Sequence, residues 1–323
     1  MACAWTVLLL AGCSASAPST LEPAGPGARR VEGLWWLLFW ISLVVYVIVM
    51  AVLVVALLRR RRRGPVNRGD ATRFVVVAGV VLPFLVLTSV YLVGLRDMDA
   101  LSQPEADRAS DVEVTVVGHQ WWWEVRYPGS GAVTANEVHI PVGVDVRLDL
   151  TTADVLHSFW VPELMPKTDM ISGRTNTTWL HADRPGTYRG HCAEYCGLQH
   201  GNMAFHVVAQ PRAEFDAWLA RAARPAPEPD TAAERRGLAV FEQTGCAACH
   251  TIRGTSADGT VGPDLTTIGS RWSIGAGAAP NTPGDLGGWV VDPRTIKPGN
   301  LMPPQPVPAQ ELPDLIAYLR SLK

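Results

Sequence analysis

Residues 190–203 read GHCAEYCGLQHGNM. Four side chains in this short stretch can bind a soft metal ion: Cys192, Cys196, His200 and Met203. A second imidazole lies upstream, at His157 in the segment VLHSFWVP. Thiolate, imidazole and thioether donors together suit copper, but a mononuclear blue-copper site needs only one cysteine. Two copper ions that share both thiolates would use every donor in the set.

Two other interpretations of the cysteine pair use fewer of these residues. Cys192 and Cys196 could form a disulfide, because the membrane topology described below places them outside the cytoplasm. They could also form half of a structural zinc site with His200. Neither alternative gives a role to His157 or Met203.

The pattern C-x-E-x-C-G-x-x-H-x-x-M, with an upstream histidine in V-L-H-S-x-x-V-P, resembles the binuclear copper A centre of cytochrome c oxidase subunit II. By position, the resemblance implies copper ligands at His157, Cys192, Cys196, His200, Met203 and the backbone carbonyl of Glu194. It also implies that the Glu194 side chain reaches a magnesium ion at the boundary with subunit I.

The segment GHQWWWEV, residues 118–125, is similar to the family's G-H-Q-W-x-W segment. The first tryptophan of that motif is where electrons reach the copper, and the resemblance assigns this role to Trp121. The ordinary alternative is a row of aromatic residues that alternate between core and surface, which we expect for Trp122 and Trp123. Four other histidines lack ligand spacing and are expected to be structural: His119, His139, His181 and His206. His191 is next to Cys192 and could compete as a ligand, but in an extended segment its side chain would point to the opposite face.

Residues 246–250 read CAACH, the C-x-x-C-H attachment motif of c-type haem. Cys246 and Cys249 would form thioethers, and His250 would be the proximal iron ligand. No histidine follows it, and the only later methionine is Met302, which we expect as the sixth ligand. A thioredoxin-like redox motif is the alternative, but it would explain neither the histidine nor the methionine.

Two further features favour a cytochrome c domain. The segment GPDL, residues 262–265, resembles the family's Gly-Pro-x-Leu loop, whose proline carbonyl accepts the histidine N–H. Residues 309–322 space their leucine and isoleucine side chains at helical intervals, as expected for a terminal packing helix. Fused cytochrome domains of this kind occur in the oxidase family.

Two apolar runs predict membrane-spanning helices, at residues 34–58 and 74–95. Pro83 lies inside the second run, where neighbouring helices can satisfy the freed backbone groups. The short loop between the runs begins with arginine at each of residues 59–63, which marks the cytoplasmic side. The two helices are therefore expected to span a bacterial cell membrane. The N-terminus and everything after the second helix are expected on the extracytoplasmic side.

The first residues resemble a bacterial lipoprotein signal. The sequence Leu-Ala-Gly-Cys ends at Cys13, which implies cleavage before this residue and lipidation of its thiol. No lysine or arginine precedes the apolar run, so an ordinary signal peptide, an uncleaved leader or an upstream start codon are alternatives.

The rest of the chain suggests a multidomain protein. Alternating apolar and polar residues from Asp111 onward predict antiparallel strands, and the resemblance implies an all-β Greek-key cupredoxin sandwich. With the two-helix transmembrane hairpin and an all-α cytochrome c domain, the expected segments are 1–33 (signal), 34–97 (hairpin), 98–210 (copper A domain), 211–230 (helix and proline-rich linker) and 231–323 (cytochrome c).

The function expected from the resemblance is electron transfer from haem c through copper A to subunit I, where oxygen is reduced and protons are pumped. Expected partners are subunit I, other oxidase subunits, the membrane, and a cytochrome bc-type complex or soluble cytochrome c as donor. The net charge of −2 gives no indication of nucleic-acid binding. A copper chaperone or storage protein and a nitric oxide reductase subunit are rivals. Asp97 and Asp99 follow the second span, but their sequence context assigns neither a proton role.

Overall fold

The computed structural model describes residues 18–59, 68–102, 110 and 112–323. It contains two compact units, one formed by Arg29–Arg108 and the other by the rest of the chain. The expected lipidation site, Cys13, lies outside the described residues.

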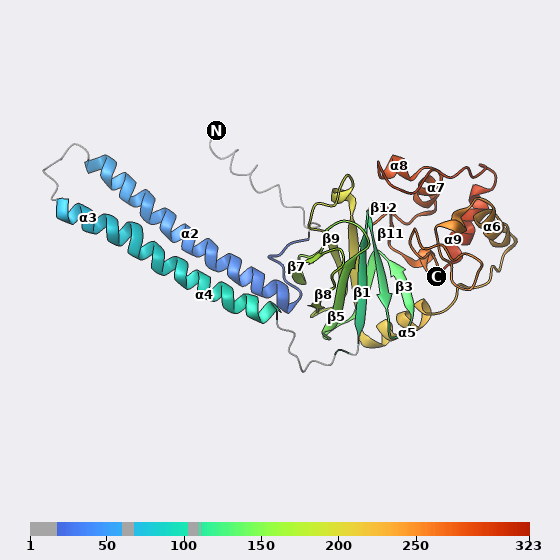
Figure 1. Ribbon diagram of the computed structural model, residues 1–323, viewed down its shortest axis with the longest axis horizontal. Helices are drawn as coiled ribbons and strands as arrows, with labels where there is room; N and C mark the ends of the chain where they lie inside the picture. Colours follow the sequence, from blue (N-terminus) through green and yellow to red (C-terminus); the bar gives the residue numbers. More distant parts are fainter. Residues whose placement is uncertain (1–17, 60–67, 103–109, 111) are drawn as a thin grey trace, which may run out of the picture. The chain divides into compact units, whose positions relative to one another are not determined.

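The smaller unit is a helical hairpin whose two arms run side by side (Figure 1). Its elements are α2 (Pro26–Arg59), α3 (Arg68–Val76), the π-helical turn η1 (Val77–Val81) and α4 (Leu82–Ser102). Both arms are long and apolar enough to cross a membrane, which agrees with the two predicted spans. Near the open end, the Arg30 guanidinium lies 3.7 Å from the Asp97 carboxylate.

The π-helical turn has a local cause in Pro83. Proline has no N–H to donate to the carbonyl four residues earlier, and its ring crowds that carbonyl. The helix accommodates the proline with one wider, π-helical turn, in which the Leu82 N–H donates to the Val77 carbonyl five residues earlier. The second arm therefore continues through the proline as a modified helix.

The copper A domain predicted from the sequence is a sandwich of two five-stranded sheets, ordered β3-β2-β1-β5-β8 and β4-β10-β9-β6-β7. The strands of the first sheet are β1 (Glu113–His119), β2 (Trp122–Tyr127), β3 (Ala132–Ala135), β5 (Val146–Thr152) and β8 (Asn176–Leu180). Those of the second are β4 (Glu137–Pro141), β6 (His157–Val161), β7 (Met165–Met170), β9 (Gly186–Cys192) and β10 (Ala204–Gln210).

Most strand pairs are antiparallel, but β1 pairs with β5 and β10 with β4 in parallel. The prediction of antiparallel strands is therefore wrong at these two pairs. Alternation along a strand reports which side chains are buried, and it carries no information about the direction of the neighbour.

Aromatic side chains form the centre of the sandwich close to the cysteine loop. Trp123 is fully buried, with its ring 5.1 Å from that of Phe205, which stacks on Phe159 at 4.3 Å. Gly190 lies against this cluster, since a Cβ there would come within 2.2 Å of the Phe205 ring. The glycine that opens the GHCAEYC segment thus lets β9 pass over the core.

A short helix, α5 (Arg212–Ala222), follows the sandwich as predicted. The linker after it contacts the C-terminal domain directly. The Ala226 N–H donates to the Arg253 carbonyl at 2.7 Å, and the Arg253 guanidinium donates to the Ala222 carbonyl at 2.6 Å. The proline-rich segment is therefore packed against the domain that follows it.

The C-terminal domain is built mainly from helices. They are α6 (Ala232–Gln243), η3 (Cys246–Ala248), η4 (Ile268–Ser270), α7 (Pro283–Val291), α8 (Pro293–Ile296) and α9 (Leu312–Ser321). Helices α6 and α9 cross at Gly237, where a Cβ would come within 2.1 Å of the Asp314 carbonyl oxygen. The expected terminal helix is α9.

One small hairpin departs from the expected all-α domain. Strands β11 (Ser273–Ile274) and β12 (Ala279–Pro280) are joined by a sharp turn. The turn needs left-handed backbone at Gly275, Ala276 and Gly277, with φ of 61°, 61° and 78°. Glycine adopts such angles without a steric penalty at two of these positions, and Ala276 is the one residue of the three with a side chain.

Candidate functional site

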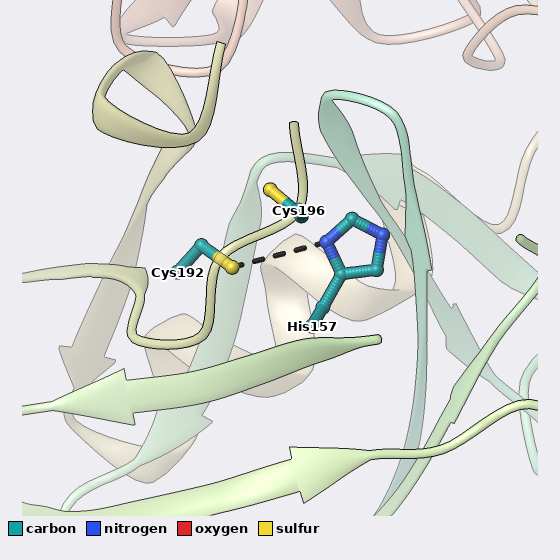
Figure 2. Close-up of side chains that lie close together, drawn as sticks. All are labelled: His157, Cys192 and Cys196. Carbon is teal, nitrogen blue, oxygen red and sulfur yellow. Dashed lines mark hydrogen bonds between the residues drawn. The ribbon is translucent and has the colours of Figure 1, made fainter. Parts of the chain in front are cut away.

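The cysteine loop meets His157 at one end of the sandwich. Cys192 ends β9 and His157 begins the neighbouring strand β6. Figure 2 shows the Cys192 sulfur and the His157 ring facing each other, with Cys196 beside them. The Cys192 Sγ lies 3.8 Å from His157 Nδ1, and the potential ligand atoms of all three residues lie within 4.8 Å of one another.

The remaining predicted ligands surround the two sulfurs. Cys196 Sγ is 3.7 Å from His200 Nδ1 and 3.7 Å from Met203 Sδ. On the other side, Cys192 Sγ is 3.1 Å from the Glu194 carbonyl oxygen. The six predicted donors therefore form two similar groups, each with one thiol, one imidazole and one weaker donor.

Backbone hydrogen bonds hold the loop that carries these donors. The Cys192 N–H donates to the Met203 carbonyl at 2.9 Å, and the Ala193 N–H donates to the Ser158 carbonyl at 3.0 Å. Gly197 turns the chain with a φ of 110°, which other residues rarely adopt. The donor positions are consequently fixed by the sandwich itself.

An acidic residue that the sequence analysis did not identify orients the first histidine. The Asp154 carboxylate lies 2.9 Å from His157 Nε2, so Nδ1 is the ring nitrogen that faces the sulfurs. Burial alone would lower the pKa of His157, but hydrogen bonds to Cys192 and Asp154 raise it above its ordinary value. The only sequence signal was an aspartate three residues before the histidine.

The two thiols share their protons unequally. A hydrogen bond from Cys196 lowers the pKa of Cys192, helped by His157 and by backbone groups, and the same bond raises the pKa of Cys196. Both cysteines are free thiols, which does not support the disulfide interpretation.

The side chain of Glu194 points to a different partner. Its carboxylate accepts a hydrogen bond from Lys167 Nζ at 3.0 Å, on an exposed part of the domain. The backbone carbonyl and the side chain of this residue therefore face different surroundings.

The C-x-x-C-H motif lines a cavity of about 360 Å³ in the C-terminal domain. All four residues predicted to hold haem contribute to its wall: Cys246, Cys249, His250 and Met302. His250 Nδ1 lies 2.8 Å from the Pro263 carbonyl, as the loop resemblance implies. Burial lowers the pKa of His250, which favours the neutral imidazole that binds iron.

The pocket wall fits a haem in its polar groups as well. Arg271 Nε and Ser273 Oγ are buried, line the cavity and have no hydrogen-bond partner within the described residues. Buried polar groups normally have partners, and the carboxylates of a haem would supply them. The rest of the wall is largely apolar: Leu265, Ile268, Leu286, Val290, Leu315 and Leu319.

The copper domain closes part of the same cavity. Its contribution comes from the turn between β1 and β2, from the first residue of β2 and from the residue between β3 and β4: Gln120, Trp121, Trp122 and Asn136. The Trp121 indole N–H donates to the Cys196 carbonyl at 2.9 Å, and the Gln120 amide donates to the same oxygen at 2.8 Å. Trp121 therefore contacts the haem cavity and the cysteine loop at once.

Lys297 is a second residue that the sequence analysis missed. It belongs to the C-terminal domain and is 1% exposed, and its Nζ donates to the Trp121 carbonyl at 2.7 Å. Burial lowers the pKa of Lys297 to about 7. No local motif indicated it, since its partner is far away in the sequence.

Trp122 and four of the other histidines contact residues away from the sulfurs. Trp122 stacks on His119 at 4.2 Å, and the ring of His191 lies edge-on to Trp160 at 4.9 Å. His139 hydrogen-bonds Gln210 at 3.0 Å, and His181 pairs with Asp145 at 2.8 Å. These contacts agree with the structural roles expected for the histidines.

Comparison with known proteins supports the assignment of both the sandwich domain and the C-terminal domain. Residues 130–210 match the family model "Cytochrome C oxidase subunit II, periplasmic domain", and residues 234–323 match "Cytochrome c". The cytochrome c oxidase subunit 2 of Alkalihalophilus pseudofirmus is 40% identical over 245 residues, which cover 76% of this chain and 69% of the relative.

Two further relatives match almost the whole chain. The cytochrome c oxidase subunit 2 of Bacillus sp. strain PS3 is 34% identical over 98% of this chain and 94% of its own. That of Bacillus subtilis is 28% identical over 98% of this chain and 95% of its own. Together with the two apolar helices, these matches make the protein a membrane oxidoreductase subunit with an extracytoplasmic copper domain and a cytochrome c domain. The chain belongs to the cytochrome c oxidase subunit II family.

Proposed function

We propose that this chain conducts electrons from a covalently bound c-type haem, through Trp121, to a binuclear copper A centre and on to subunit I. The observation that carries the proposal is the position of Trp121. Trp121 lines the haem cavity, and its indole N–H donates to the Cys196 carbonyl at 2.9 Å. One side chain thus connects the two redox sites within a single protein.

The copper ligands in this proposal are the two donor groups described above. His157, Cys192 and the Glu194 carbonyl form one group, and Cys196, His200 and Met203 form the other. Copper bound to both thiolates supplies one-electron chemistry in which the charge is shared between the metals. The protein keeps the donors in place by burying both cysteines and Met203, so little needs to rearrange when the charge changes.

The haem is held in this proposal by thioethers at Cys246 and Cys249 and by His250 and Met302. The Pro263 carbonyl fixes the orientation of the His250 ring through Nδ1, which leaves Nε2 free to bind iron. A His/Met ligand pair raises the reduction potential of haem iron. Arg271 and Ser273 complete the pocket as partners for the haem carboxylates.

The partners follow from this assignment. Subunit I accepts the electron and carries out oxygen reduction and proton pumping, and a cytochrome bc-type complex or a soluble cytochrome c supplies it. The expected magnesium ion would bind the Glu194 side chain at the boundary with subunit I. In the structure, the Glu194 carboxylate accepts a hydrogen bond from Lys167. The lipid anchor at Cys13 belongs to the proposal on sequence grounds alone.

Metal content tests the copper assignment against a copper carrier or a zinc site. We expect the purified protein to hold two tightly bound copper ions per chain and to give the EPR signal of a charge shared between two coppers. One labile copper would favour a chaperone or storage protein, and a bound zinc with no such signal would refute the centre. Co-purification with an oxygen-reducing subunit I, and not a nitric oxide reductase, tests the partner.

Replacing Asp154 by asparagine is expected to weaken copper binding about 10–100-fold, the usual cost of losing a partner that orients a ligand. The carboxylate is 2.9 Å from His157 Nε2 and fixes which ring nitrogen faces the sulfurs. Competition with a chelator measures the affinity. Asp216→Asn, at an exposed residue paired with Arg212 on α5, is the control and should bind copper like the wild type. Equal affinities for both variants would show that Asp154 does not orient the ligand.

A further inference from the structure

A buried lysine joins the two redox domains. Lys297 Nζ donates to the Trp121 carbonyl at 2.7 Å and to the Gly275 carbonyl at 2.8 Å. Trp121 belongs to the copper domain, whereas Gly275 and Lys297 belong to the haem domain. Lysine is almost never fully buried without a partner. Here the amine bridges one backbone carbonyl from each domain.

We propose that Lys297 is a positioning residue that keeps the haem domain docked on the copper domain, with Trp121 held between the two redox sites. The inference rests on the proposed electron route and adds a residue to it. Trp121 is then fixed from both sides, by Lys297 at its carbonyl and by the Cys196 carbonyl at its indole N–H. Lys297 also lines the haem cavity, so it acts where the two domains meet.

Other buried contacts support a fixed dock. The Glu137 carboxylate of the copper domain accepts a hydrogen bond from the Trp272 backbone N–H at 2.6 Å, and Glu137 is itself buried. Lys297 and Glu137 therefore act reciprocally, because each is a buried polar side chain that forms a hydrogen bond with the backbone of the other domain. Separation of the domains would break both hydrogen bonds, and each such bond contributes modestly to the stability of the docked arrangement.

The dock also touches the segment that carries the copper ligands. The Ala204 N–H, directly after Met203, donates to the Ala276 carbonyl at the tip of the β11–β12 turn, at 2.9 Å. The Gln199 amide, directly before His200, donates to the Pro298 carbonyl, next to Lys297. The haem domain thus binds the copper loop on both sides of the His200–Met203 segment. The contacts are specific hydrogen bonds to backbone, which define one orientation of the domains.

A fixed dock differs from a tethered domain that searches for its partner. A flexible linker would raise the local concentration of the haem domain near the copper domain. Each electron transfer would still require the two domains to meet first. In this structure the linker packs against the haem domain, and the interface carries its own buried contacts. Lys297 is the contact that reaches Trp121 itself.

The test uses the assembled oxidase with Lys297→Met, which keeps the length of the side chain and removes its donors. Lys323→Met, at an exposed lysine of the same domain, is the matched control. Three quantities are measured: the rate of electron transfer from haem to copper, the midpoint potentials of both centres, and deuterium exchange of the Trp272 and Ala204 amides. If Lys297→Met does not assemble, Lys297→Gln, which keeps a shorter N–H donor, takes its place.

We expect Lys297→Met to slow transfer from haem to copper at least about tenfold, the rate equivalent of losing a buried hydrogen-bonded group. The two amides should exchange faster and the reduction of haem by its donor should stay unchanged, while any change in the two midpoint potentials should be too small to account for the slower transfer. Unchanged transfer, with or without faster exchange, would overturn the positioning role. If the proposed electron route itself were wrong, the result would be different. Copper in the wild-type protein would then be reduced by the donor without prior reduction of haem.

Discussion

Replacing Cys196 by serine is expected to remove the binuclear copper centre and to leave the c-type haem attached. Cys196 lies between His200 and Met203, with its sulfur 3.7 Å from a donor atom of each. A serine hydroxyl is a poor ligand for copper in a soft donor set, and two coppers cannot share both thiolates when one is missing. Copper content should fall from two ions per chain to one or none, and the shared-charge EPR signal should disappear.

Cys246→Ser is the reciprocal control for this experiment. Cys246 lines the haem cavity and is absent from the copper cluster, so its loss should remove one thioether and preserve the copper signal. The haem spectrum under denaturing conditions reports the thioether, and EPR reports the copper. A Cys196→Ser protein that kept two coppers and the wild-type signal would contradict the ligand assignment.

Replacing Trp121 by phenylalanine is expected to slow electron transfer between haem and copper by roughly 100-fold, the scale on which a misplacement of about 1 Å costs a reaction. Phenylalanine lacks the indole N–H that binds the Cys196 carbonyl, and its smaller ring fills less of the cavity wall. The copper ligands are untouched, so the EPR signal should remain. Rapid reduction of the assembled oxidase, followed at both centres, measures the rate.

Trp122→Phe provides a matched control for this prediction. Trp122 lines the same cavity, but its ring stacks on His119 at 4.2 Å, and within the part of the chain that the structure describes its indole forms no hydrogen bond with the cysteine loop. Its replacement should therefore change the transfer rate far less. Equal slowing in both variants would indicate a general disturbance of the haem pocket, and no slowing in Trp121→Phe would remove this residue from the route.

The candidate donor residues could be named from the sequence because their types and local spacing are unusual. Cys192, Cys196, His200 and Met203 lie in one loop, and the haem motif occupies residues 246–250. Two thiols, an imidazole and a thioether at such spacing have few alternative uses. The structure brings these side chains together with His157, which supports the predicted set without containing the metal.

The residues that hold the sites in place were not predictable in the same way. Lys297 and Trp121 are 176 positions apart, and Glu137 and Trp272 are 135 apart. Such pairs exist only after both domains have folded and docked, and a single lysine or glutamate carries no local sign of burial. Asp154, three residues before His157, was nearer but lay outside the quoted motif.

The sequence predicted the fold class of each domain, but it did not predict strand direction, the π-helical turn or the packing of the linker. Burial alternation identified strands correctly, but not that β1 and β5 are parallel. Pro83 was expected within a span, while the π-helical turn before it depends on how the backbone relieves a local clash. The sequence predicts a proline-rich linker, but it does not predict the contacts with Arg253, which arise from tertiary packing.

The central claim, that electrons reach copper only through the haem of the same chain, is tested most directly by stopped-flow reduction of the assembled oxidase at increasing donor concentration. The absorbance of haem c and the near-infrared band of copper A are recorded together. The account predicts that haem is reduced first, at a rate that rises with donor, and that copper follows at a rate that becomes independent of donor. Copper reduced ahead of haem, or without it, would contradict the account.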